Sequence, residues 1–146
     1  MTQVNKFEKL GFQLLIAGLA IICFIPGGVA TFGGINASTA MATGDLILST
    51  DSMLNGFVDN QYRFGFGVFF AQGLVLLFFL SNISEHRHLF RFAALALFIG
   101  GVGRLTNIVE HGVLDDQVVG PTVIELVAIP LLVLWHLRIV NKIKAA

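Results

Sequence analysis

FIGGVGRLTNIVEH, residues 98–111, closes a long apolar segment that begins near Leu89. The segment is long enough to cross a bilayer as a helix, and Arg104 lies inside it. An arginine in a membrane costs roughly 3 to more than 10 kcal/mol unless it is paired or hydrated. Residues three or four positions apart share one face of a helix, so one polar stripe holds Gly100, Arg104, Asn107 and His111.

A second stripe on the same stretch consists of short side chains: Ala96, Gly100, Gly103 and Asn107. Small residues let the backbones of two membrane helices approach closely. We therefore expect this face to pack against a neighbouring helix, with Gly100 and Gly103 at the contact, and a partner for Arg104 to lie on that neighbour.

The composition indicates an integral membrane protein. The chain has 146 residues, of which 55% are hydrophobic and only 12% charged, whereas about a quarter of the residues in a soluble domain are charged. The single cysteine, Cys23, lies in an apolar run, which excludes an internal disulfide and a CxxC redox pair. No basic patch suggests nucleic acid, and no cofactor is expected.

Hydropathy predicts an all-α fold, a single membrane domain over residues 1–146 built as a four-helix bundle. The predicted spans are residues 10–30, 64–80, 89–109 and 121–140, and Pro130 is expected to kink the last one. An alternative for the first span is a secretory signal peptide, which its length disfavours.

The charges predict the orientation of the spans. Every lysine and arginine except Arg63 and Arg104 lies near a terminus or in the turn at residues 81–88, or just after that turn. Most acidic residues lie in the other two connections. By the positive-inside rule both termini face the cytoplasm, and Arg63 and Arg104 lie at or within the outer boundary.

Residues 31–60 are expected to form an outer loop, because they are rich in Gly, Ser, Thr, Asp and Asn and have no lysine or arginine. Asp51 or Ser52 could cap a short helix that places Leu54 and Phe57 on one side. An irregular loop with a few apolar anchors is the alternative.

Counting depth along the spans brings Arg104 and Glu125 together. Arg104 lies seven residues before His111, roughly 10 Å along a helix, and Glu125 lies four residues into the last span, roughly 6 Å from the same side. An ion pair is therefore expected. Alternatively, Thr122 and Glu125 form a capping box at a helix start, which is compatible with the pair.

Two roles remain open for Arg104: a pair that fixes helix register, or a ligand pocket open to the outer face. Glu110 and His111 could join the nearby loop carboxylates around a metal, but a solvated loop is favoured and no metal is expected. The candidate ligand-binding residues are Asn60, Arg63, Arg104, Asn107, Glu110, His111 and Glu125.

Two motifs carry a resemblance: NQYRFGFG at residues 60–67 and FIGGVGRL at residues 98–105. They resemble the small bacterial four-helix membrane proteins of domain-of-unknown-function family 4345. The resemblance implies one four-span membrane domain, location in a bacterial inner membrane, and importance for Asn60, Arg63, Gly67, Gly101 and Arg104. It implies no known activity.

The expected function is that of a small binding or accessory protein, whose polar pocket takes a lipid headgroup, a small anion or a helix of a transmembrane partner. The first alternative is a membrane enzyme acting on a lipid-like substrate, with Glu110, His111 or Glu125 as acid or base. A small transporter is the second, although only Gln72 is polar near a span centre.

Overall fold

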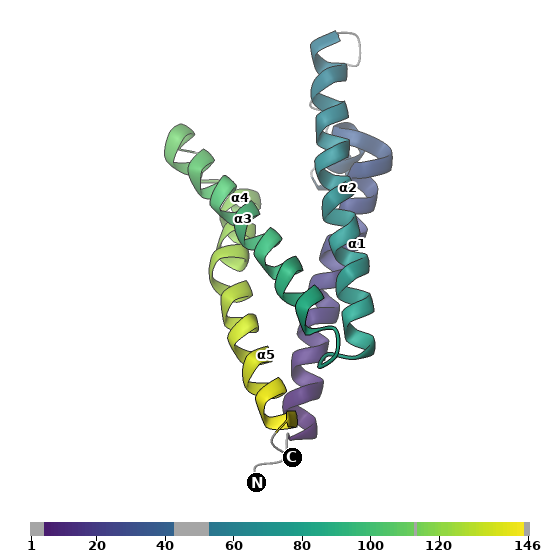
Figure 1. Ribbon diagram of the computed structural model, residues 1–146. Coiled ribbons are helices and arrows are strands. Elements are labelled where there is room, and N and C mark those ends of the chain that lie inside the picture. Colours follow the sequence, from purple (N-terminus) through teal and green to yellow (C-terminus); the bar gives the residue numbers. More distant parts are fainter. Residues whose placement is uncertain (1–4, 43–52, 113, 145–146) are drawn as a thin grey trace. The chain divides into compact units, whose positions relative to one another are not determined.

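The structure is a computed structural model that describes residues 5–42, 53–112 and 114–144, and in these ranges it contains helices and turns but no strand (Figure 1). The elements are α1 (Lys6–Ala42), α2 (Met53–Ser81), α3 (Arg87–His111), α4 (Asp116–Val123), the π-helical segment η1 (Ile124–Ala128) and α5 (Ile129–Lys144). The predicted all-α class is confirmed.

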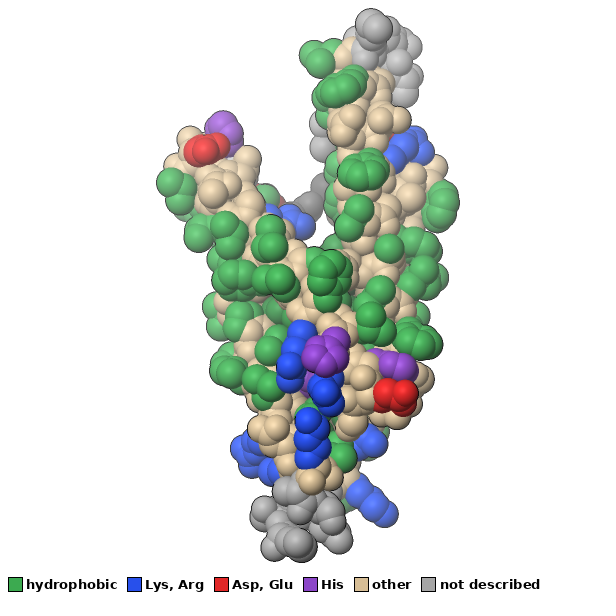
Figure 2. Space-filling model, in the orientation of Figure 1, with side chains coloured by type: hydrophobic (Ala, Val, Ile, Leu, Met, Phe, Trp, Pro, Cys, Tyr) green, Lys and Arg blue, Asp and Glu red, His purple; other side chains and the backbone are tan. Residues whose placement is uncertain are grey.

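Four helices are long and apolar enough to cross a membrane: Lys6–Ala42, Leu54–Ser81, Arg87–His111 and Val118–Lys144. Large apolar side chains cover much of the surface, including Phe7, Phe92 and Val109, which are at least 70% exposed, and Figure 2 shows such side chains along the helices. A water-soluble monomer rarely exposes so much apolar surface. These are the features of a small integral membrane protein.

The helices are longer than the predicted spans. Residues 31–42 continue α1 and residues 53–60 begin α2, so the expected outer loop is helical at both ends. Glycine, serine and threonine favour loops, but a helix tolerates them once tertiary contacts hold it in place. The expected caps Asp51 and Ser52 lie outside the described residues.

The chain folds as two compact units. The first combines the start of α1, up to Leu15, with the chain from Phe79 onward; the second spans Ile16–Phe78. A single domain over residues 1–146, and the packing of all four spans in one bundle, stay predictions.

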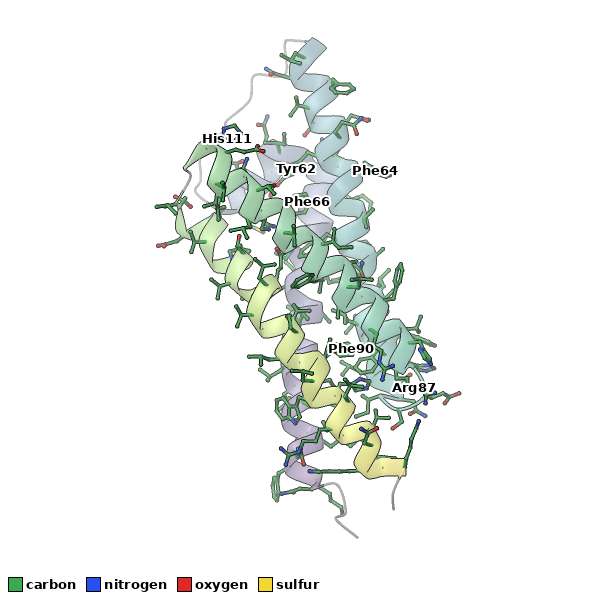
Figure 3. The ribbon with its side chains drawn as sticks, turned by 60° about the vertical axis from the view of Figure 1, so that its left-hand side comes forward. Tyr62, Phe64, Phe66, Arg87, Phe90 and His111 are labelled. Carbon is green, nitrogen blue, oxygen red and sulfur yellow. The ribbon has the colours of Figure 1, made fainter. Side chains whose placement is uncertain are left out.

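The core of the first unit is a cluster of rings around His136. Phe12, Phe79 and Phe90 contact one another and the imidazole, with ring centroids 4.9 to 5.5 Å from that of His136. His136 is fully buried, and its Nε2 donates a hydrogen bond of 2.7 Å to the Ile83 carbonyl. This bond ties α5 to the turn before α3. Figure 3 shows Phe90 near one end of α3 and His111 at the other.

In the second unit α1 and α2 approach closely at two glycines. A Cβ atom on Gly27 would lie 2.9 Å from the Phe70 nitrogen, and one on Gly73 would lie 2.9 Å from the Phe24 nitrogen. Any larger residue would push the two backbones apart. The glycines therefore set the distance between the two helices.

Two irregularities interrupt the helices. Within α1 the backbone breaks at Gly34, where φ is 73° and ψ is −166°, a region that is essentially restricted to glycine. Before α5 the chain forms η1, in which the Ile129 N–H donates to the Ile124 carbonyl five residues earlier. Pro130, expected to kink this span, has no N–H for the Leu126 carbonyl, which explains a wider turn just before it.

Candidate functional site

The predicted contact between Arg104 and Glu125 is present in the first unit. Arg104 Nε on α3 donates to Glu125 Oε2 on η1 at 3.1 Å, and the two side chains are 37% and 11% exposed. The nearly buried Glu125 carboxylate thus binds one edge of the Arg104 guanidinium, and the Arg104 side chain as a whole is more exposed than that of Glu125. The pair has the chemistry expected for an arginine within a span.

Gly101 makes this contact possible. A Cβ atom on Gly101 would lie 2.7 Å from the Glu125 Cβ and 3.0 Å from the Leu126 side chain. The expectation that Gly100 and Gly103 form the close contact is wrong within this unit. Gly100 reaches only Glu125 Oε2, at 4.0 Å, and nothing described lies within 4 Å of a Cβ on Gly103. The helical repeat predicts which residues share a stripe, but it does not predict which side of the helix the neighbouring segment contacts.

The capping-box interpretation of Glu125 is wrong. The last span begins well before Thr122, because α4 starts at Asp116. The Thr122 hydroxyl donates to the Val118 carbonyl at 2.7 Å, as a threonine inside a helix does. Glu125 therefore lies in the interior of the span, in a π-helical turn, a feature frequent at functional sites.

The terminal nitrogens of Arg104 define what the pair can do. Among residues 5–42, 53–112 and 114–144, Glu125 is the acceptor that the structure gives to this guanidinium, and the bond uses Nε. Nη1 and Nη2 point along the other edge of the planar group, which matches two oxygens of a carboxylate or phosphate. The arrangement is thus suited to an oxyanion.

Three other candidates on α3 lie in the open. Asn107 is exposed, and Glu110 and His111, whose side chains are 70% and 63% exposed, approach each other only to 4.0 Å. In the described part of the chain, no three His, Cys, Asp or Glu residues gather as metal ligands would. Their assignment to a ligand site stays a prediction.

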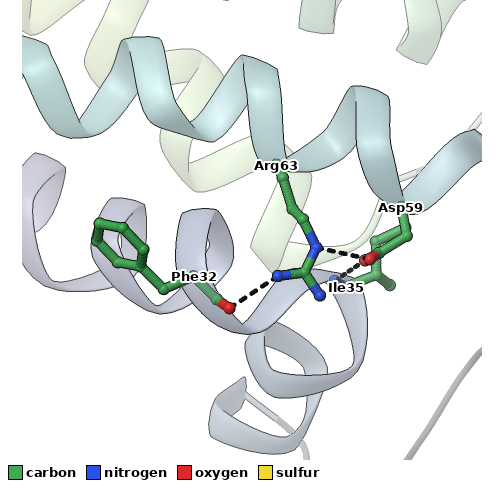
Figure 4. Close-up of polar contacts among 4 residues, drawn as sticks. All are labelled: Phe32, Ile35, Asp59 and Arg63. Carbon is green, nitrogen blue, oxygen red and sulfur yellow. Dashed lines mark hydrogen bonds and ion pairs between the residues drawn. The ribbon is translucent and has the colours of Figure 1, made fainter.

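Arg63 makes its contacts in the second unit, at the break in α1 (Figure 4). Its Nε donates to Asp59 Oδ2 and its Nη1 to the Phe32 carbonyl, both at 2.7 Å. Asp59 Oδ1 in turn accepts from the Ile35 N–H at 2.7 Å. One ion pair on α2 therefore satisfies the free carbonyl before Gly34 and the free N–H after it.

Sequence reasoning missed this second cluster. Arg63 and Asn60 were expected among the ligand-binding residues, and that assignment stays a prediction. The described contacts of Arg63 are with Asp59 and Phe32, and Asn60 is exposed. The available signal was the spacing of Asp59 and Arg63, which is four residues. A further hydrogen bond joins α2 to α1 nearby: the Tyr62 hydroxyl donates to Ser38 Oγ at 2.8 Å.

The fold is that of a small, all-helical membrane protein. Two arginines in its candidate spans each pair with a carboxylate, Arg63 with Asp59 and Arg104 with Glu125. The chain belongs to the family described as "Domain of unknown function (DUF4345)", whose model matches residues 11–136. No curated protein and no solved structure matches the chain. The resemblance seen in the two motifs is thereby confirmed.

Proposed function

We propose that this protein is a binding or accessory protein of a bacterial inner membrane, and that Arg104 receives an oxyanion. The oxyanion is the phosphate or carboxylate of a lipid headgroup or of a small anion. Both termini face the cytoplasm in this proposal, because the basic residues gather near them and at the turn before α3. The end of α3 that carries Arg104 then lies on the outer side.

One observation carries the proposal: Glu125 holds Arg104 through Nε alone. An arginine that served only to fix helix register would gain most from a bidentate pair, in which two nitrogens meet two oxygens. Here the carboxylate orients the guanidinium and leaves the Nη1 and Nη2 edge without a described protein acceptor. Inside a membrane those N–H groups require one.

Glu125 also limits which ligands fit. Its carboxylate neutralises Arg104, so the pair offers an incoming anion directed N–H groups rather than net positive charge. Recognition therefore depends on the fork geometry, and lysine, a point charge on a flexible stem, is a poor substitute. This favours a planar carboxylate or a phosphate over a halide.

The test is native mass spectrometry of protein extracted in mild detergent, comparing the parent with R104M/E125M and R104K. Removing one member of the pair strands the other charge, whereas replacing both preserves folding. We expect the parent to retain an anionic molecule, the double variant to fold without it, and R104K to lose most of it.

A control variant is R138K, which changes an exposed arginine at the opposite end of the first unit without removing its charge and should keep the molecule. If the folded double variant carries the same molecule at the same occupancy, Arg104 is scaffolding and the proposal is wrong. A parent that retains no anionic molecule, from either lipid or buffer, also contradicts it.

A further inference from the structure

Seven basic side chains gather at one end of the first unit. They come from the first turns of α1, the first turns of α3 and the last turns of α5: Lys6, Lys9, Arg87, Arg91, Arg138, Lys142 and Lys144. Glu8 joins the helix ends, because its carboxylate lies 2.6 Å from Lys142 Nζ and 3.3 Å from Arg138 Nε. Figure 2 shows Lys and Arg side chains gathered in the lower part of the view.

The acidic residues at this end do not balance the basic ones. They are Glu8 and Glu85, and Glu8 is already shared by Arg138 and Lys142. Glu85 accepts from the Asn82 amide. Within the described ranges, Lys6, Lys9, Arg87 and Lys144 have no carboxylate at ion-pair distance. This end therefore carries a strong positive potential.

The start of α3 adds to that potential. Its first turn contains no acidic residue, and His86 at the N-cap makes no side-chain capping bond. The N-terminus of a helix carries a partial positive charge that acidic side chains usually offset. Here Arg87 and Arg91 stand in the first turns instead, which increases the attraction for anions.

Apolar side chains alternate with these cations in the same turns and are also exposed: Phe7, Leu10, Leu89, Phe92 and Ile143. A soluble acidic partner or a nucleic acid would leave them in water. A phospholipid offers both complements, an anionic headgroup for the cations and acyl chains for the apolar side chains.

We propose that this basic end of the first unit is a docking surface for anionic phospholipids, which it selects over zwitterionic ones. The cations that lack a carboxylate hold the phosphates, and the exposed apolar residues between them pack against the acyl chains. This surface is separate from the Arg104–Glu125 pair and does not depend on the function proposed for it.

The only tryptophan of the chain gives a direct readout. Trp135 lies one turn before Arg138 on α5, with its ring 3.8 Å from the position of a Cβ on Gly11. Brominated acyl chains quench tryptophan fluorescence on contact. Vesicles of phosphatidylcholine containing either brominated phosphatidylglycerol or brominated phosphatidylcholine therefore report which lipid gathers beside this end of the unit.

We expect phosphatidylglycerol to associate about fivefold or more tightly than phosphatidylcholine at low salt, since each basic residue near an anionic surface strengthens binding about fivefold. In the variant K6Q/K9Q/R87Q/K144Q the ratio should fall to about one. The matched variant K6R/K9R/R87K/K144R keeps every charge and should keep the preference.

A second measurement needs no substitution. Raising the salt to about 1 M shortens the screening length to about 3 Å and should remove most of the preference of the parent. Equal quenching by the two lipids in the parent overturns the proposal. So does a preference that survives in the glutamine variant, or binding of a soluble polyanion that leaves the two lipids equally close to Trp135.

Discussion

Replacing Gly34 by alanine adds only one methyl group, but it should strongly destabilise the second unit. Gly34 has φ 73° and ψ −166°, a conformation that costs other residues about 1–3 kcal/mol. The added Cβ would also overlap the Asp59 carboxylate and the Arg63 guanidinium. These groups hold the broken ends of α1 through the Phe32 carbonyl and the Ile35 N–H.

The magnitude follows from these two effects. Each hydrogen bond to a charged group contributes about 1.5–3 kcal/mol, and we expect the Cβ to weaken at least one of them. Because the Arg63 and Asp59 side chains are 38% and 29% exposed, solvent reduces the cost of separating them. The sum is a loss of about 3 kcal/mol or more in the free energy of unfolding.

The assay is reversible unfolding in mixed detergent micelles, followed by circular dichroism. Gly18 is the matched control, because it lies in the same helix and a Cβ there meets nothing within 4 Å among the described residues. G18A should be neutral or stabilising by up to about 1 kcal/mol. If G34A unfolds like the parent and G18A, the break in α1 does not depend on glycine and the argument fails.

Reporter fusions active only outside the cytoplasm should give signal at Asp115 and none at Glu85; the opposite pattern would refute the orientation proposed from the charges. G101A should lower the melting temperature in detergent, because its Cβ would lie 2.7 Å from the Glu125 Cβ, too close for a van der Waals contact. G103A should leave the melting temperature unchanged or raise it slightly, because its Cβ meets nothing described within 4 Å. H136A should cost about 2–5 kcal/mol of unfolding free energy, since it empties a fully buried site among three rings and leaves a carbonyl without its donor; a parent-like melt would show that the ring cluster does not hold α5.

The Arg104–Glu125 contact could be predicted from the sequence because few polar residues in the apolar segments lie at the depth of Arg104. Both residues lie in long apolar segments, and the rise of a helix converts their positions into distances from the same surface. An unpaired charge at that depth is so unfavourable that its partner is nearly determined. The family resemblance rests partly on the motif that contains Arg104, and the family was confirmed over residues 11–136.

The break at Gly34 could not be predicted in this way. It falls in a stretch whose composition resembles a loop, and the residues that make it stable, Asp59 and Arg63, come from another helix. Local pattern contains no information on such a contact. The prediction of which α3 glycines form the close contact was wrong within the first unit for the same reason. Periodicity groups Gly100 with Gly103, whereas the side chains of Glu125 and Leu126 approach at Gly101.

The π-helical turn at Ile124–Ala128 changes the phase of the last span. Such a turn holds one residue more than an α-helical turn, so every position after it is rotated by about 100° relative to an uninterrupted helix. His136 in α5 is therefore shifted by one residue around the helix axis, relative to Glu125 in η1, from its position in an uninterrupted α-helix. Deleting a single residue in this turn would be the smallest change able to swing the Glu125 carboxylate to another side of the span while leaving α5 itself intact.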